Sequence, residues 1–223
     1  DKVRVLGIPC RYQMSYTKLA SRMDVAGDLL GVEETGEEVT ITTSRGRFMV
    51  KKDEVLLDKC AGCDMPNPVS VDHLIGEPVS PDPGPDGFAA VKQMESMTAG
   101  EREAFWLGQF ERCIRCYACR NVCPGCTCVQ CVFDTIKPDW GGKEVNASEN
   151  ELFHLTRAFH LAGRCVDCGE CDRVCPMNIP LRLLNKKILM DCRELFGAET
   201  PGAVEDGKTV LGQFRQEDPE EFM

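Results

Sequence analysis

The chain contains CIRCYACRNVCP at residues 113–124 and CVDCGECDRVCP at residues 165–176. Both stretches follow the pattern Cys-x2-Cys-x2-Cys-x3-Cys-Pro, which is the spacing of a [4Fe–4S] ferredoxin half-site. Three cysteines spaced three apart wrap a tight loop around one face of a cube-shaped cluster, and the fourth, beside a proline, points away from that loop. Two complete copies of the pattern therefore predict two [4Fe–4S] clusters.

The fourth cysteine of each run predicts how the two runs are combined. In two-cluster ferredoxins this cysteine binds the cluster of the other run. The pattern thus predicts crossed ligation, with three ligands from one run and one from the other. The first cluster would be held by Cys113, Cys116, Cys119 and Cys175. The second would be held by Cys165, Cys168, Cys171 and Cys123.

Five further cysteines predict a third site. Cys60 and Cys63 form one Cys-x2-Cys pair, and Cys128 and Cys131 form another. Each pair can bind one metal ion or one edge of a cluster. Four thiolates would hold either a third [4Fe–4S] cluster or structural zinc, which also accepts four thiolates. Cys126 is an alternative ligand to Cys128, and loosely structural free thiols are the remaining interpretation.

Four isolated residues are expected to be structural. Cys10 and Cys192 stand apart from the other cysteines, and we expect both to be buried free thiols that pack as small apolar groups. His154 and His160 have neither a carboxylate partner nor the spacing of a metal site. We expect them to be packing or surface residues.

Composition limits the class of partner. The 223 residues include 15 cysteines and carry a net charge of −10, so nucleic-acid binding, which needs basic patches, is excluded. An acidic surface suits docking to basic sites on redox partners. Thiols in cluster spacing favour a reducing compartment over a disulfide framework. No apolar stretch is long enough for a membrane span and no signal peptide is visible, so we expect a cytoplasmic protein, although residues may precede Asp1.

Patterning predicts an α+β fold in four parts. We expect a β-rich N-terminal module at residues 1–79, a Pro/Gly-rich linker at 80–97, an α-helical dicluster ferredoxin domain at 98–197 and an extended tail at 198–223. In the first module, residues 39–50 alternate around Ser44-Arg45-Gly46, which predicts a hairpin. Val3–Ile8 and Val55–Leu57 are further strand candidates.

Three helices are expected around the cysteine runs. Thr98 and Glu101 fit a capping box that begins a helix ending near Arg112. Apolar residues at helical spacing predict a second helix from about residue 148 to 162 and a third from 181 to 196. The two runs would therefore be separated by a helix, unlike the compact arrangement of small bacterial ferredoxins.

The chain resembles a family at CIRCYACRNVCPGCTCVQC, at FHLTRAFHLAGRCVDCGECDRVCP and at LRLLNKKI. It is similar to the iron–sulfur electron-transfer subunits of heterodisulfide-reductase-like and formate-dehydrogenase-like complexes of anaerobes. The resemblance covers residues 98–223 and extends more weakly to residues 55–79. It implies an anaerobic, low-potential pathway and a partner subunit that contains a flavin, molybdenum or tungsten. It supports as ligands the eight cysteines of the two runs and, less firmly, Cys60, Cys63, Cys128 and Cys131.

These observations predict an electron-transfer subunit that does not catalyse alone. The sequence contains no nucleotide-binding fingerprint and no arrangement of nucleophile and base. The chain would accept electrons at one cluster and pass them through the others to a partner. Two alternatives stay open: an iron–sulfur sensor or regulator, and a catalytic subunit that acts on thiols or disulfides. A sensor normally brings a DNA-binding or signalling module, which the sequence does not show.

Overall fold

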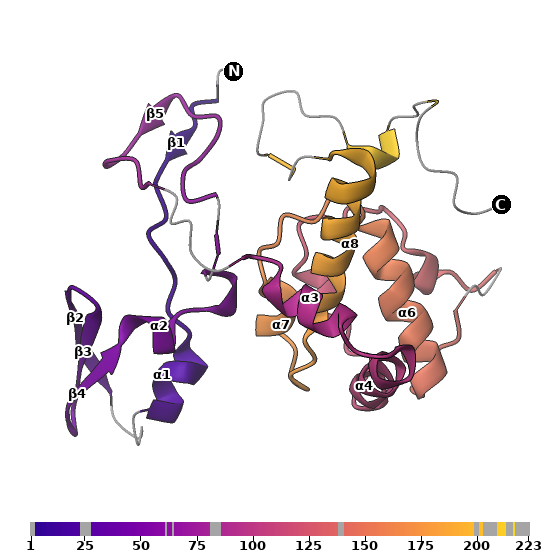
Figure 1. Ribbon diagram of the computed structural model, residues 1–223, viewed down its shortest axis with the longest axis horizontal. Helices are drawn as coiled ribbons and strands as arrows, with labels where there is room; N and C mark the ends of the chain where they lie inside the picture. Colours follow the sequence, from indigo (N-terminus) through magenta and orange to yellow (C-terminus); the bar gives the residue numbers. More distant parts are fainter. Residues whose placement is uncertain are drawn as a thin grey trace. The chain divides into compact units, whose positions relative to one another are not determined.

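The computed structural model describes residues 3–22, 28–60, 62–63, 65–80, 86–137, 141–198, 201–202, 209–212 and 216. The chain forms two compact units, Asp1–Gly87 and Phe88–Met223 (Figure 1). The first unit contains the strands, and the second contains the longer helices. Each unit is described separately below.

A three-stranded antiparallel sheet forms the core of the first unit. Its strands lie in the order β2 (Leu29–Thr35), β3 (Glu38–Thr43) and β4 (Gly46–Lys51). Thr43 pairs with Gly46 at the turn, so the hairpin predicted over residues 39–50 is confirmed. Alternate side chains of β3 point to one face, where Val39 and Ile41 are buried together with neighbouring apolar residues.

The other elements of the first unit are short. They are β1 (Leu6–Gly7), α1 (Tyr16–Arg22), α2 (Lys52–Val55), η1 (Asp58–Cys60) and β5 (His73–Leu74). The short strands β1 and β5 pair in parallel. Strand β1 lies within the predicted strand Val3–Ile8, whereas β5 was not predicted.

The predicted strand Val55–Leu57 is wrong. Val55 ends α2 and is completely buried in the core of the sheet, and Leu56 forms only an isolated bridge with Met14. Acidic Asp53 and Glu54 occupy the first turn of α2, where negative charge stabilises a helix. Val55 therefore packs against the core of the sheet from the end of a helical turn rather than from a strand.

The second unit is built from helices. They are α3 (Ala89–Glu95), α4 (Ala99–Glu111), α5 (Ala118–Asn121), η2 (Val132–Asp134), α6 (Ala147–His160), α7 (Glu170–Arg173), α8 (Leu181–Phe196) and η3 (Val210–Gly212). The three predicted helices are confirmed as α4, α6 and α8. The capping box is also present, because the Thr98 hydroxyl accepts from the Glu101 amide and the Glu101 carboxylate accepts from the Thr98 amide.

Helix α3 lies in the second half of the range that we assigned to a linker. The prolines and glycines that oppose regular structure end at Gly87, and the following AAVKQME contains only residues compatible with a helix. Val91 is buried, and α3 packs against α8. The helical unit therefore begins about ten residues before the capping box.

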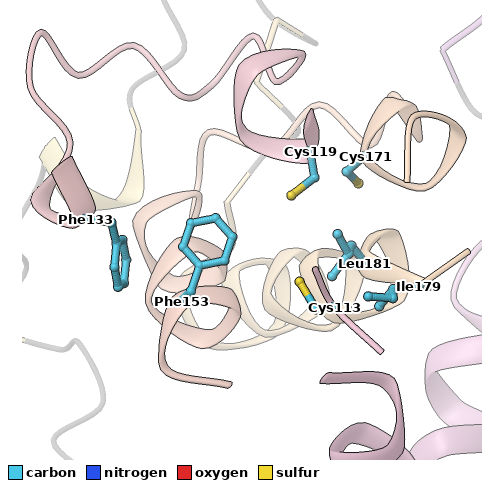
Figure 2. Packing of buried hydrophobic residues seen from close by; sticks show 7 residues of the cluster. All are labelled: Cys113, Cys119, Phe133, Phe153, Cys171, Ile179 and Leu181. Carbon is cyan, nitrogen blue, oxygen red and sulfur yellow. The ribbon is translucent and has the colours of Figure 1, made fainter. Parts of the chain in front are cut away.

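The core of the second unit includes part of the cysteine runs. Figure 2 shows Cys119 of α5, Phe153 of α6, Cys171 of α7 and Leu181 of α8 among the side chains of one buried cluster. Helix α4 packs on α6, while α6 and α7 both pack on α8. The helices thus meet around the thiols.

Candidate metal centres

The two cysteine runs fold into equivalent loops. The second and fourth residues after the first cysteine have positive φ in both: Arg115 (56°) and Tyr117 (60°) in one, Asp167 (51°) and Gly169 (70°) in the other. This left-handed backbone is uncommon outside glycine. It bends each run immediately before a short helix, α5 or α7. The sequence repeat is therefore also a backbone repeat.

Each loop lines a small cavity together with one cysteine of the other run. The first cavity is lined by Cys113, Cys116, Cys119 and Cys175. The second is lined by Cys165, Cys168, Cys171 and Cys123. These are the two groups that crossed ligation predicts. Their function as ligands remains a prediction.

The donor chemistry of the cavities fits an iron–sulfur cluster. In the part of the chain that the structure describes, no three His, Cys, Asp or Glu side chains are grouped to hold one metal ion. Four thiols around one cavity suit a [4Fe–4S] cluster, in which each cysteine binds a different iron. Burial raises the pKa of Cys119 to about 11 and that of Cys171 to about 12. Binding of a cluster must consequently displace the thiol protons.

Asn150 of α6 fixes the position of Cys113. The Asn150 side chain is fully buried, and its Nδ2 atom donates to the carbonyl oxygens of Phe110, at 2.9 Å, and of Cys113, at 2.8 Å. The two carbonyl groups lie in the last turn of α4 and just beyond it, where carbonyl oxygens have no N–H partner within the helix. The amide therefore joins α4 to α6 at the point where the first run begins.

His154 of α6 is buried against the first cavity. Its Nε2 atom lies 3.3 Å from Cys113 Sγ, and its ring stacks on Phe110 with centroids 5.3 Å apart. Burial, followed by the charges of Arg157 and Arg115, lowers the His154 pKa to about 3. The imidazole is therefore neutral, and with its proton on Nε2 it donates to the sulfur. The sequence predicted packing for His154 but missed the thiol contact, whereas His160 is exposed.

Arg115 stabilises the strained loop to which it belongs. Its guanidinium donates to the carbonyl oxygens of Glu149, at 2.7 Å, and Gly142, at 3.3 Å, and lies 4.9 Å from the ring centroid of Phe153. Its own amide donates to Cys113 Sγ at 3.4 Å. These contacts hold a residue with φ of 56° in place. No motif in the sequence points to Arg115.

Arg157 connects the two cavities. It is only 5 % exposed, its Nη2 atom donates to the Cys119 carbonyl at 3.0 Å, and its side chain lines the second cavity. Its charge also acts on the thiols of Cys119, Cys126, Cys123 and Cys171. One buried cation thus faces thiols of both predicted cluster sites.

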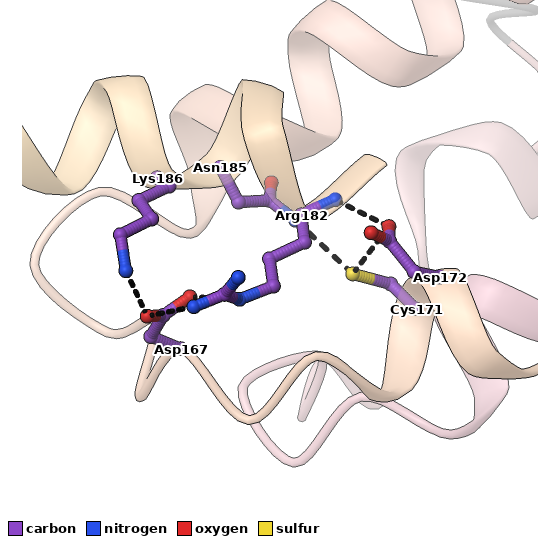
Figure 3. A network of polar contacts seen from close by, with 6 residues as sticks. All are labelled: Asp167, Cys171, Asp172, Arg182, Asn185 and Lys186. Atoms are coloured by element: carbon purple, nitrogen blue, oxygen red, sulfur yellow. Dashed lines mark hydrogen bonds and ion pairs between the residues drawn. The ribbon is translucent and has the colours of Figure 1, made fainter. Parts of the chain in front are cut away.

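Asp167 ties the second loop to α8 (Figure 3). Its carboxylate accepts two hydrogen bonds from the Arg182 guanidinium, both at 2.7 Å, and one from Lys186 Nζ at 2.6 Å. The amide of Arg182 donates to Asp172 of α7 at 2.6 Å. Asp167 has a φ of 51°, so this network holds the left-handed residue of the second loop as Arg115 does in the first.

Further N–H groups point at cysteine sulfurs. Asn185 Nδ2 of α8 donates to Cys171 Sγ at 3.7 Å, as Figure 3 shows, and the amide of Ile179 donates to Cys175 Sγ at 3.4 Å. Hydrogen bonds to the sulfurs are one of the ways in which a protein sets cluster potential. Both cavities therefore combine thiols with N–H donors.

The remaining predicted ligands lie in different units. Cys126, Cys128 and Cys131 line a larger cavity in the helical unit. Cys60 and Cys63 lie in the first unit, where the Cys63 amide donates to the Cys60 carbonyl at 3.3 Å. The predicted set of Cys60, Cys63, Cys128 and Cys131 spans the two units and stays a prediction.

The two isolated cysteines differ. Cys192 is 4 % exposed on α8, so its predicted burial is confirmed. Cys10 is exposed, and the prediction of burial is wrong there. Its amide donates to the Pro66 carbonyl at 2.7 Å, which fixes the backbone of an irregular segment and leaves the side chain outside the sheet core.

Comparison with known families identifies the segment around the two four-thiol cavities. Residues 109–179 match the 4Fe-4S dicluster domain. The match covers about a third of the chain. It includes both cysteine runs and helix α6 between them, so the match and the two cavities cover the same residues. The domain carries [4Fe–4S] clusters.

Two curated relatives share part of this sequence. The chain is 34 % identical over 93 residues to the F420-dependent formate dehydrogenase subunit beta of Methanocaldococcus jannaschii, covering 41 % of this chain and 24 % of that protein. It is 36 % identical over 107 residues to the F420-dependent formate dehydrogenase 1 subunit beta of Methanococcus maripaludis, covering 48 % of this chain and 27 % of that protein. The similarity thus spans about a quarter of each relative.

Among the described residues, none of the helices combines the length and the apolar character that crossing a membrane requires.

Proposed function

We propose that this chain is an electron-transfer subunit of an anaerobic multisubunit oxidoreductase. It would relay single electrons through two [4Fe–4S] clusters, one held by Cys113, Cys116, Cys119 and Cys175, the other by Cys165, Cys168, Cys171 and Cys123. The observation that carries the proposal is the pair of equivalent four-thiol cavities within one hydrophobic core. Cys119 and Cys171, from opposite cavities, belong to the same buried cluster.

The surroundings of the cavities suit redox centres that must be insulated from water. Phe153, Ile179 and Leu181 are each at most 2 % exposed and line the first cavity. Apolar walls and N–H donors to sulfur set the potential of a bound cluster, which supplies the one-electron chemistry. The protein's part is to fix the spacing, to exclude water and to provide hydrogen bonds and charge.

The partners are proposed from the relatives. Both are beta subunits of formate dehydrogenases by name, so we infer that this chain also works beside a further redox subunit. That subunit would contain a flavin, molybdenum or tungsten. The net charge of −10 would direct this chain to a basic docking site on such a partner.

The proposal is tested on the native complex, purified anaerobically with its co-purifying subunits. Replacing any of the eight cysteines by serine should abolish electron transfer through the complex while the half-reactions of the neighbouring subunits persist. Cys192→Ser is the matched control, because Cys192 is buried in the same unit but lines neither four-thiol cavity.

Assays on the isolated chain can contradict the proposal. Dithionite should reduce it, yet it should show no turnover with formate, hydrogen, NADH or a disulfide. Substantial turnover by the chain alone would overturn the electron-transfer assignment in favour of a catalytic subunit.

A further inference from the structure

We propose that Cys126, Cys128 and Cys131 together hold a third iron–sulfur cluster within the helical unit. The spacing of the cysteines admits Cys126 as a substitute for Cys128 in a site shared with Cys60 and Cys63. The structure instead brings all three thiols to one cavity of about 290 Å³. The proposal rests on the proposed function, since this centre would extend the same electron path.

The segment that carries these thiols has the geometry of a binding loop. The three cysteines fall within six residues that form no α-helix or strand, and η2 (Val132–Asp134) follows directly. Cys126 and Cys131 are half-buried and Cys128 is exposed. An irregular backbone with closely spaced cysteines can point several thiols at one cluster, as the two main loops do.

The wall of this cavity carries more positive than negative charge. Arg120, Arg157 and Arg164 line it together with the thiols and with Asp134, which pairs with Arg120 at 2.8 Å. A [4Fe–4S] cluster with thiolate ligands carries net negative charge, which the guanidinium groups of Arg157 and Arg164 would complement. The wall also contains Phe133 and Phe153, which limit contact with water.

Arg157 supplies a second observation. It is 5 % exposed, and its Nε atom has no hydrogen-bond partner among the residues that the structure describes. Buried N–H donors in folded proteins are nearly always hydrogen-bonded, so this Nε–H should have an acceptor when the site is occupied. An anionic cluster in the neighbouring cavity would provide one.

The three thiols would bind separate irons of one cluster, as the thiols of the two four-thiol cavities do in the proposed function. Three thiolates from this segment would bind three of the irons, and the fourth iron would take a ligand from outside the segment.

The site lies beside the second predicted cluster. The amide of Cys126 donates to the carbonyl oxygen of Cys123 at 3.1 Å. Cys123 also lines the second four-thiol cavity. A cluster bound by Cys126 would therefore be a direct neighbour of the second cluster in the electron path.

Metal content of the full chain, produced anaerobically with iron and sulfide, tests the proposal. The wild type should contain about twelve irons, since each [4Fe–4S] cluster holds about four. Cys126→Ser, Cys128→Ser and Cys131→Ser should each lose about a third of the iron and the corresponding Mössbauer component, with the other two clusters retained. Cys10→Ser, at an exposed cysteine outside this cavity, is the control and should keep all the iron.

Three outcomes separate this proposal from the proposed function. About eight irons in the wild type, unchanged in the three variants, would overturn the third cluster and leave the two-cluster relay intact. About eight irons with one zinc lost in the variants would overturn the cluster in favour of zinc. Loss of the third component in Cys60→Ser and Cys63→Ser, but not in Cys126→Ser, would overturn the role of Cys126.

Discussion

The Nε2 atom of His154 lies 3.3 Å from the Sγ atom of Cys113. The imidazole is buried and neutral. Because a thiolate bound to iron can only accept, His154 would donate to it from Nε2. A donor at a ligand sulfur favours the reduced, more negative state of a cluster. The contact thus makes His154 a residue that positions and tunes the first centre.

Replacing His154 by phenylalanine removes this hydrogen bond and keeps an aromatic ring between Phe110 and Phe153. The first cluster should become harder to reduce. A hydrogen bond of about 1 kcal/mol corresponds to roughly 40 mV for a one-electron couple. Redox titration followed by EPR measures the shift. His160→Phe, at an exposed position on the same helix, should leave both potentials unchanged, and an equal shift there would contradict the role of His154.

Arg157 should affect both clusters, because it donates to the Cys119 carbonyl and lines the second cavity. We expect Arg157→Lys, which keeps the charge but loses the fork of donors, to retain both clusters with altered EPR spectra. Arg157→Met should lower both midpoint potentials. The matched control is Arg173→Met, whose guanidinium pairs with Glu170 and is 56 % exposed. A shift in only one cluster would refute the bridging role.

The Asp167 network predicts a large loss of stability. Asp167→Asn keeps a residue that tolerates positive φ but leaves Arg182 and Lys186 without their counter-ion; these side chains are 14 % and 8 % exposed. Breaking a buried charge network should cost roughly 3 kcal/mol. Anaerobic urea unfolding of the loaded protein measures it. Glu170→Gln, which removes the partner of exposed Arg173, should cost less than about 1 kcal/mol.

The capping box of α4 should make a pH-dependent contribution to the free energy of unfolding. Hydrogen bonds from the Thr98 side chain and then its backbone lower the Glu101 pKa. The stabilisation is therefore fully present above the ordinary glutamate range and is lost as pH falls through the lowered pKa. Thr98→Ala should cost about 1 kcal/mol at neutral pH. The difference between wild type and Thr98→Ala in urea unfolding should shrink at acidic pH; a constant difference would argue against the carboxylate's part.

The helices near the cysteine runs could be predicted because the residues that begin and end them lie within the same short stretch of sequence. The Thr98 and Glu101 pair marks the start of α4, and Gly197, in the left-handed conformation, ends α8. The strand predicted at Val55 failed because one buried apolar residue fits a helical turn as well as a strand.

The residues around the thiols could not be predicted in the same way. Asn150, His154 and Arg157 lie on one helix far from Cys113 and Cys119 in sequence, and only the packing of α6 against the loops gives them their roles. Buried polar side chains on a mainly apolar helix face are the one signal that could have pointed to them.

Crossed ligation is the central claim, and one pair of variants tests it most directly. Cys175→Ser and Cys123→Ser should be compared by Mössbauer and EPR spectroscopy of the anaerobically loaded chain. Cys175→Ser should perturb the cluster whose potential responds to His154→Phe, and Cys123→Ser should perturb the other one. If each serine instead perturbs the cluster built by its own run, with Cys175→Ser leaving the His154-sensitive cluster unchanged, the account is contradicted.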